Sequence, residues 1–192
     1  MPILTSEEVE KEVVMQVSKL MLVSVRTAPK SWGVDDVLTS TLVGTEKEAL
    51  AAEMDRIADE RGIDGFKRDA DNVRNSDAVV LIGVRGTKSV GDSDCGACGF
   101  TTCANFNKTE RIPGKDFLGP TCVFKSIDLG IALGSAVKTA SLHNVDNRTM
   151  YRVGAGARRL KLLPEATIII GIPVSAKGKS IYFDRKWKAP TK

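Results

Sequence analysis

The sequence predicts an α/β fold in which helices cover a sheet in layers. Segments with apolar residues at helical spacing alternate with short apolar runs of strand length along the 192 residues. Hydrophobic residues make up 42% of the chain and aromatic residues only 5%, as in an ordinary globular protein. No apolar stretch approaches the roughly 18 residues that cross a bilayer. We therefore expect one soluble domain over residues 1–192 with a small insertion, and no membrane partner.

The first third of the chain predicts two helices and a strand. Thr5 and Glu8 have the spacing of a capping box, which begins a helix that Pro29 ends. Its apolar positions at helical spacing are Val9, Val13, Val17 and Leu20. Residues 36–43 alternate like a strand, and Thr45 with Glu48 predicts a second capping box, for a helix that runs to Gly62.

The next segment predicts a central strand. Residues 78–84, AVVLIGV, are apolar without interruption, which is typical of a strand covered on both faces. Before it, Asp69 and Asn72 indicate a helix cap or a turn.

The last third predicts two helices and a buried strand. Residues 126–142 read as a helix of small residues with Asp128 near its start, and residues 147–162 read as a helix that ends before Pro164. The run GAGA at 154–157 lacks the preceding strand that a phosphate loop requires, so we attribute it to helix packing. Residues 166–172, ATIIIGI, predict the strand.

The most informative feature is the placement of the four cysteines. Cys95, Cys98, Cys103 and Cys122 are the only cysteines of the chain, separated by two, four and eighteen residues. Structural zinc usually takes two close pairs of ligands, whereas iron–sulfur clusters are held by sets of cysteine thiolates, often three close together and one distant. Gly96 and Gly99 flank Cys98 and permit tight winding. This pattern favours a four-cysteine [4Fe-4S] cluster within an insertion at about 90–124.

Other arrangements of the four thiols remain open at this point: one zinc ion, two disulfides or unconnected thiols. Disulfides require an oxidising compartment, and the acidic, polar N-terminal residues do not resemble a secretory signal. We therefore expect a cytoplasmic location. The net charge of +4 is modest, and the basic tail from Lys177 lacks interleaved aromatic residues. These features favour a solvated tail over binding to nucleic acid.

Five sequence blocks resemble an uncharacterised prokaryotic family containing a ferredoxin domain. The likeness extends from about Val13 to Lys186, and its blocks are RTAPKSWGVDDVLTSTLVG, FKRDADNVRNSDAVVLIG, CGACGFTTC, DLGIALGSAVKTASLHNVDNRTMYRVG and GIPVSAKGKSIYFDR. The cysteine run also resembles the four-iron module in electron-transfer subunits of anaerobic enzymes. The resemblance implies an iron–sulfur redox protein that passes electrons to a bound flavin, a small-molecule acceptor or a partner protein.

A more distant resemblance links the surrounding sequence to nitroreductase-like flavoproteins. It rests on Ala28-Pro29 after a long helix, on Leu-Gly-Ser at 133–135, and on Gly-Ile-Pro at 171–173. The resemblance implies a nitroreductase-like layered fold, FMN as a cofactor and a homodimer built on the first helix and helix 126–142. The Arg-rich opening segment of those proteins is absent, and only Lys11 and Lys19 occur there.

The same resemblance implies positions for a flavin. The phosphate is expected near Arg26, Lys30 or Arg185, and the ring against Gly134 and Ser135. His143, the only histidine, is expected to be structural, and Trp32 either covers a cleft or fills a loop. No catalytic residue is predicted, since the chain offers no hydrolase pattern. The alternative function is a non-enzymatic module in which a metal only staples residues 95–122 to the fold.

Overall fold

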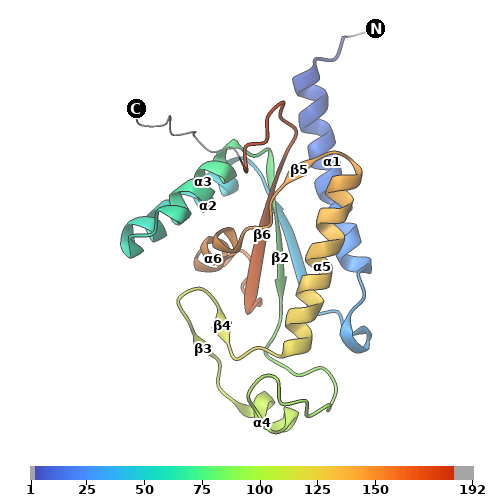
Figure 1. The fold of residues 1–192 in the computed structure, drawn as a ribbon, viewed down its shortest axis with the longest axis vertical. Helices are drawn as coiled ribbons and strands as arrows, with labels where there is room; N and C mark the ends of the chain where they lie inside the picture. Colours follow the sequence, from blue (N-terminus) through green and yellow to red (C-terminus); the bar gives the residue numbers. More distant parts are fainter. Residues whose placement is uncertain (1–2, 184–192) are drawn as a thin grey trace, which may run out of the picture.

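The structure, a computed structural model, describes residues 3–183 and consists of an antiparallel sheet between two layers of helices (Figure 1). Its elements are α1 (Ser6–Thr27), the short 3₁₀ turn η1 (Ser31–Gly33), β1 (Val37–Leu42), α2 (Gly44–Arg61), α3 (Asp64–Asn75), β2 (Ala78–Val84), α4 (Cys103–Lys108), β3 (Ile112–Pro113), β4 (Leu118–Gly119), α5 (Val123–Leu142), β5 (Asp146–Asn147), α6 (Tyr151–Arg159) and β6 (Ile168–Ser175). The predicted layered α/β architecture is confirmed.

The main sheet has the order β1-β2-β6-β5, and every neighbouring pair is antiparallel. Every residue of β2 is buried, which confirms a central strand covered on both faces. Val80 and Ile82 pack with α1 and α5 on one face, whereas Val79 and Leu81 pack with α2, α3 and α6 on the other. The continuous apolar run thus serves two separate cores because successive side chains point to opposite faces.

Helix α1 begins as predicted but buries a different face. The side chains of Thr5 and Glu8 form both hydrogen bonds of the capping box. The buried positions are Val14, Val17, Ser18, Met21 and Val25, whereas Val9, Val13 and Leu20 are exposed. Apolar residues form two stripes along α1, and the predicted stripe is mostly the outer one.

Helix α2 ends as predicted at Gly62, which adopts φ +66°, but its predicted capping box is wrong. The helix begins two residues earlier than that box requires, with Val43 at the N-cap. Thr45 lies inside the first turn, where its hydroxyl donates to Glu46 instead.

Asp69 and Asn72 are also not caps or turn residues. Both are buried inside α3, where Asp69 pairs with Arg152 of α6 at 3.0 Å.

The second half of the chain corrects two predicted boundaries. Helix α5 begins at Val123, three residues earlier than predicted, so Cys122 occupies its N-cap. The helix predicted from 147 starts only at Tyr151, because Asp146 and Asn147 pair with β6 and Met150 bridges to Gly171. The packing role of the GAGA run is confirmed, since a Cβ on Gly154 would lie 1.7 Å from the carbonyl oxygen of Ile169.

Residues 85–122 leave the layers at one end of the sheet and carry α4 and the β3–β4 hairpin (Figure 1). This cysteine arc, as we call residues 85–122, starts after the last residue of β2 and ends at the first turn of α5. None of the helices in residues 3–183 combines the length and apolarity needed to cross a membrane.

Candidate metal centre

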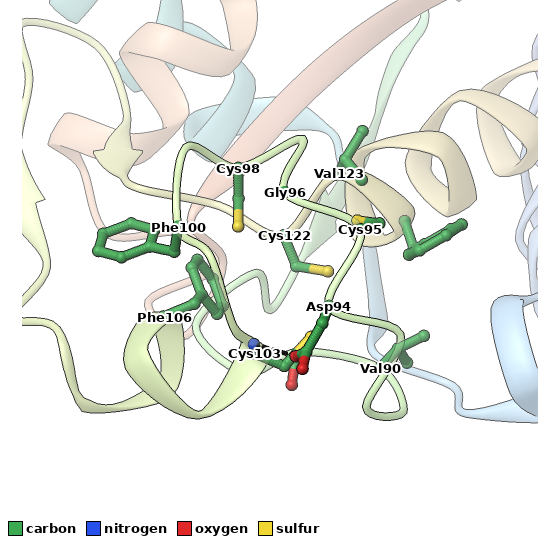
Figure 2. A pocket seen from close by; sticks show the side chains of 12 residues that line it. Val90, Asp94, Cys95, Gly96, Cys98, Phe100, Cys103, Phe106, Cys122 and Val123 are labelled. Atoms are coloured by element: carbon green, nitrogen blue, oxygen red, sulfur yellow. Dashed lines mark hydrogen bonds between the residues drawn. The ribbon is translucent and has the colours of Figure 1, made fainter.

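The four cysteines line one cavity in the cysteine arc (Figure 2). They come from three places: Cys95 and Cys98 from a loop, Cys103 from the first residue of α4, and Cys122 from the N-cap of α5. All four are free thiols. Cys122 is buried, Cys95 is exposed, and the other two are half-buried. The fold therefore brings Cys122 to one cavity with cysteines that lie at least eighteen intervening residues away in the sequence.

Two glycines and an acidic side chain shape the loop that carries the first two cysteines. Gly96 and Gly99 adopt φ +72° and +86°, and the N–H of Gly99 donates to the carbonyl of Gly96 at 2.9 Å. Such angles are accessible to glycine without strain. Asp94 accepts a hydrogen bond from the N–H of Cys103 at 2.6 Å, which ties the loop to α4. Sequence analysis missed Asp94, although it directly precedes Cys95.

The base of the cysteine arc is held by Asn107 and Arg111. The side chain of Asn107 accepts from the N–H of Ser89 at 2.8 Å and donates to its hydroxyl at 3.0 Å. Arg111 donates to the carbonyls of Phe106, Thr109 and Thr87, and its guanidinium lies 4.2 Å from the ring centroid of Phe106. Nothing in the sequence pattern singled out these two side chains, because their partners become visible only in the folded arc.

A second anchor joins the hairpin tip to the helical layer. Asp116 accepts hydrogen bonds from Arg61 at 2.6 Å and from the Tyr151 hydroxyl. Burial raises the pKa of the Asp116 carboxyl, but the hydrogen bonds from Tyr151 and Arg61 outweigh it and hold the pKa below its usual value. Burial and the neighbouring carboxylate raise the pKa of Tyr151 to about 12.

The start of α5 is fixed against the loop that follows α1. Lys125, which is almost fully buried, lies 2.7 Å from Asp36. Asp128 accepts hydrogen bonds from the N–H and the hydroxyl of Ser31 at 2.8 and 2.7 Å. Its other carboxylate oxygen is buried without a partner among the described residues. These contacts hold the helix that presents Cys122.

The donor set fits an iron–sulfur cluster chemically. Four thiol groups are the ligands that [4Fe-4S] clusters take, and no disulfide consumes them. The N-terminus of the 20-residue α5 also lies at Cys122, where its partial positive charge favours a bound anionic group. Within residues 3–183, no three His, Cys, Asp or Glu side chains converge closely enough to hold a single metal ion. The thiols thus line a shared cavity without meeting at one point.

The residues predicted for a flavin do not gather at this cavity. Arg26 pairs with Asp35 and is largely exposed. Lys30 is buried, and its ammonium donates to the carbonyls of Val25, Arg26 and Ala28 at 2.7–2.9 Å. Those three hydrogen bonds use all its donors, so Lys30 caps the end of α1 and has none left for a phosphate.

The ring contacts predicted on α5 differ from one another. A Cβ on Gly134 would meet no atom within 4 Å, so this position faces open space. The carbonyl oxygen of Ser135 accepts a hydrogen bond from the Ser24 hydroxyl of α1, so this carbonyl faces the neighbouring helix. Arg185 lies outside the described residues. His143 is the C-cap residue of α5, in keeping with a structural role.

Comparisons with known proteins show the family. An uncharacterized protein from Archaeoglobus fulgidus is 45% identical over 183 residues, which cover 95% of this chain and 97% of that protein. A family model described as "uncharacterized protein containing a ferredoxin domain" matches residues 118–185. The matched region includes Cys122 but not the other three cysteines.

Solved structures with a similar fold include nitroreductases. The FMN-dependent nitroreductase NfnB from Mycobacterium smegmatis superposes with a TM-score of 0.54 at 11% identity, over 91% of this chain and 84% of that one. A putative nitroreductase from Desulfovibrio desulfuricans, in complex with FMN, gives 0.52 at 12% identity, over 91% and 79%. Nitroreductase A from Vibrio parahaemolyticus gives 0.52 at 13% identity, and this chain spans only 62% of its length. At these identities the likeness shows the nitroreductase fold alone. The archaeal relative and the family model place the chain in the family of uncharacterized proteins containing a ferredoxin domain.

Proposed function

We propose that this protein is an iron–sulfur redox protein in which Cys95, Cys98, Cys103 and Cys122 hold a [4Fe-4S] cluster. The observation that carries the proposal is that four free thiols from three separate elements line one cavity. Membership in a family with a ferredoxin domain and a fold shared with oxidoreductases support a redox role. We also propose a cytoplasmic location, where thiols stay reduced.

The residues around the thiols have defined tasks in this proposal. The four thiolates bind the cluster, and the glycines let the loop wind around it. Phe100, Phe106 and Phe124 line the same cavity and exclude water from it. A bound cluster would supply a centre that takes up and releases one electron at a time. No side chain of the cavity is assigned an acid–base step.

A flavin is the second cofactor that we propose. FMN is named for two of the fold neighbours, and flavins accept one or two electrons, so a flavin beside a cluster can divide hydride chemistry into single steps. Gly134 offers open space for a flat ring, and Arg26 keeps N–H groups beyond the one that Asp35 accepts. We place the ring against Gly134 and Ser135 and the phosphate near Arg26, with Arg185 as a further cation.

We also propose a homodimer whose interface is formed by the outer faces of α1 and α5. Exposed apolar side chains follow the outer faces of both helices on one side of the sheet: Val9, Val13, Leu20 and Val23 on α1, and Ile127, Ile131 and Leu142 on α5. Apolar faces of this kind are typical of stable subunit interfaces.

Absorption of anaerobically purified protein tests the proposed function against the structural alternative. An iron–sulfur protein shows broad absorption at about 400 nm that bleaches on addition of dithionite. A colourless protein with one zinc ion per chain would overturn the redox proposal and favour a metal that only staples the cysteine arc to the fold.

A further inference from the structure

Trp32 is an exposed tryptophan held in an uncommon backbone conformation. The residue is 60% exposed, and its backbone adopts φ +54°, which is rare for a bulky residue. Conformations of this kind persist only where the surroundings enforce them, and they concentrate at functional sites.

The surroundings of Trp32 are fixed from both sides. Asp128 accepts two hydrogen bonds from the preceding Ser31. Lys125 donates to the carbonyl of Val34 at 3.3 Å and pairs with Asp36 on the following side. Gly91 packs against the indole, since a Cβ there would lie 3.0 Å from it. The exposed ring is therefore positioned by buried polar contacts.

Trp32 also adjoins the cysteine cavity through one aromatic neighbour. Its ring centroid lies 5.2 Å from that of Phe124, in an edge-to-face arrangement at 76°. Phe124 lines the cavity together with the four cysteines. The two rings thus form a continuous aromatic contact from the cavity wall to solvent. Gly33, next to Trp32, has no atom within 4 Å of a Cβ position, so a flat molecule has room to approach.

We propose that Trp32 is the docking point for a planar aromatic one-electron carrier, which exchanges electrons with the centre held by the cysteines across Phe124. This inference rests on the proposed function. When the carrier reduces the centre held by the cysteines, the carrier loses one electron and the centre gains one. No bond forms or breaks and no proton is required when the carrier is a viologen. The indole recognises such a carrier by stacking, and a cationic ring adds cation–π attraction.

Binding is tested by fluorescence with oxidised methyl viologen, which quenches tryptophan. W187F leaves Trp32 as the only tryptophan, and W32F leaves Trp187 as the only one. We expect Trp32 emission to be quenched at about three- to tenfold lower viologen concentration than Trp187 emission. Equal quenching of the two variants would overturn docking at Trp32. Fluorescence quenching does not depend on a bound cluster, so this test of docking at Trp32 gives a result even if the proposed function is wrong.

Electron exchange is tested by stopped-flow mixing of the oxidised holoprotein with reduced methyl viologen. We expect the bleaching at about 400 nm to be slower in W32A and in F124L than in wild type, at equal iron content. F183A is the matched control, because Phe183 is 59% exposed and lies elsewhere, beside Arg148. Unchanged rates in W32A and F124L would overturn the proposed route. A protein without the cluster absorption would overturn the proposed function instead.

Discussion

The main-chain N–H of Cys122 donates a hydrogen bond to the carbonyl of Gly86 at 3.2 Å. Gly86 lies two residues after Val84, the last residue of β2. Its own N–H donates to the Thr167 hydroxyl at 3.0 Å. The cysteine farthest along the sequence is thereby attached to the central strand of the sheet. This contact explains how a ligand eighteen residues from its nearest partner is returned to the cavity.

Replacing Gly86 by alanine should displace Cys122. A Cβ at this position would lie 2.2 Å from Cγ2 of Thr121 and 2.6 Å from the Thr167 hydroxyl. We expect G86A to lose about 1–3 kcal/mol of unfolding free energy, the usual cost of overpacking. It should also bind less iron. Urea unfolding and iron analysis measure both effects. G178A is the control, since its Cβ would meet no atom within 4 Å. Wild-type stability and iron content in G86A would show that the contact does not position the ligand.

The stability of the hairpin anchor should depend on pH. The pKa of Asp116 is lowered in the folded protein, so its contribution is present above the unfolded pKa of about 3.9 and is lost as the pH falls through the folded value. We expect D116N to lose about 1.5–3 kcal/mol of unfolding free energy at neutral pH, because hydrogen bonds to a charged group are removed.

Urea unfolding at neutral pH and at about pH 3 measures this dependence. The difference in stability between wild type and D116N should shrink in acid. D92N serves as the control, because Asp92 is an exposed carboxylate. A difference that stays constant with pH would contradict the role assigned to the Asp116 carboxylate.

Charge introduced on the outer face of α1 should disrupt the proposed homodimer. We expect the wild-type protein to sediment at twice the chain mass of 20.7 kDa at micromolar concentration. L20E should sediment as a monomer, because a buried unpaired carboxylate disfavours an apolar interface. K19E, a neighbouring exposed position, is the control. A wild-type protein that sediments as a monomer would remove the argument for a flavin site shared between subunits.

Loss of the Arg26 guanidinium should weaken FMN binding. A charge-assisted contact contributes about 1.5–3 kcal/mol, so R26A should bind FMN roughly ten- to a hundredfold more weakly than wild type. R185A is expected to act in the same direction. K138A is the control, as an exposed cation on α5. K30A should instead lower thermal stability, because its ammonium caps α1. Equal FMN affinity in wild type, R26A and R185A would exclude the proposed phosphate site.

Local sequence signals predicted most of the elements that depend on local interactions, although the equally local Thr45–Glu48 capping box was wrong. The Thr5–Glu8 capping box and the C-terminal glycine of α2 were predicted correctly because each works within one turn of helix. The run 78–84 identified the central strand because burial on both faces demands uninterrupted apolar residues. The spacing of the cysteines predicted that their side chains lie together, since three of the four occur within nine residues of the sequence.

Features that depend on distant partners could not be predicted. Asp69 resembled a cap until its partner Arg152, 83 residues away, was placed beside it. Asp146 and Asn147 form a strand only because β6 is present to pair with them. Lys30 resembled a phosphate ligand, but the carbonyls at the end of α1 use its donors. Val9, Val13 and Leu20 of α1 were predicted to face the core but are exposed. The sequence does not show which of the two apolar faces of this helix meets the sheet.

The most direct test of the central claim is analysis of iron and acid-labile sulfide in anaerobically purified protein and in C98S. Wild type should contain about four irons and four sulfides per chain, as a four-cysteine cubane requires. C98S should lose most of both. S93A, a serine of the same arc beside Asp94, is the matched control and should keep them. Full iron content in C98S, or zinc without sulfide in wild type, would contradict the account.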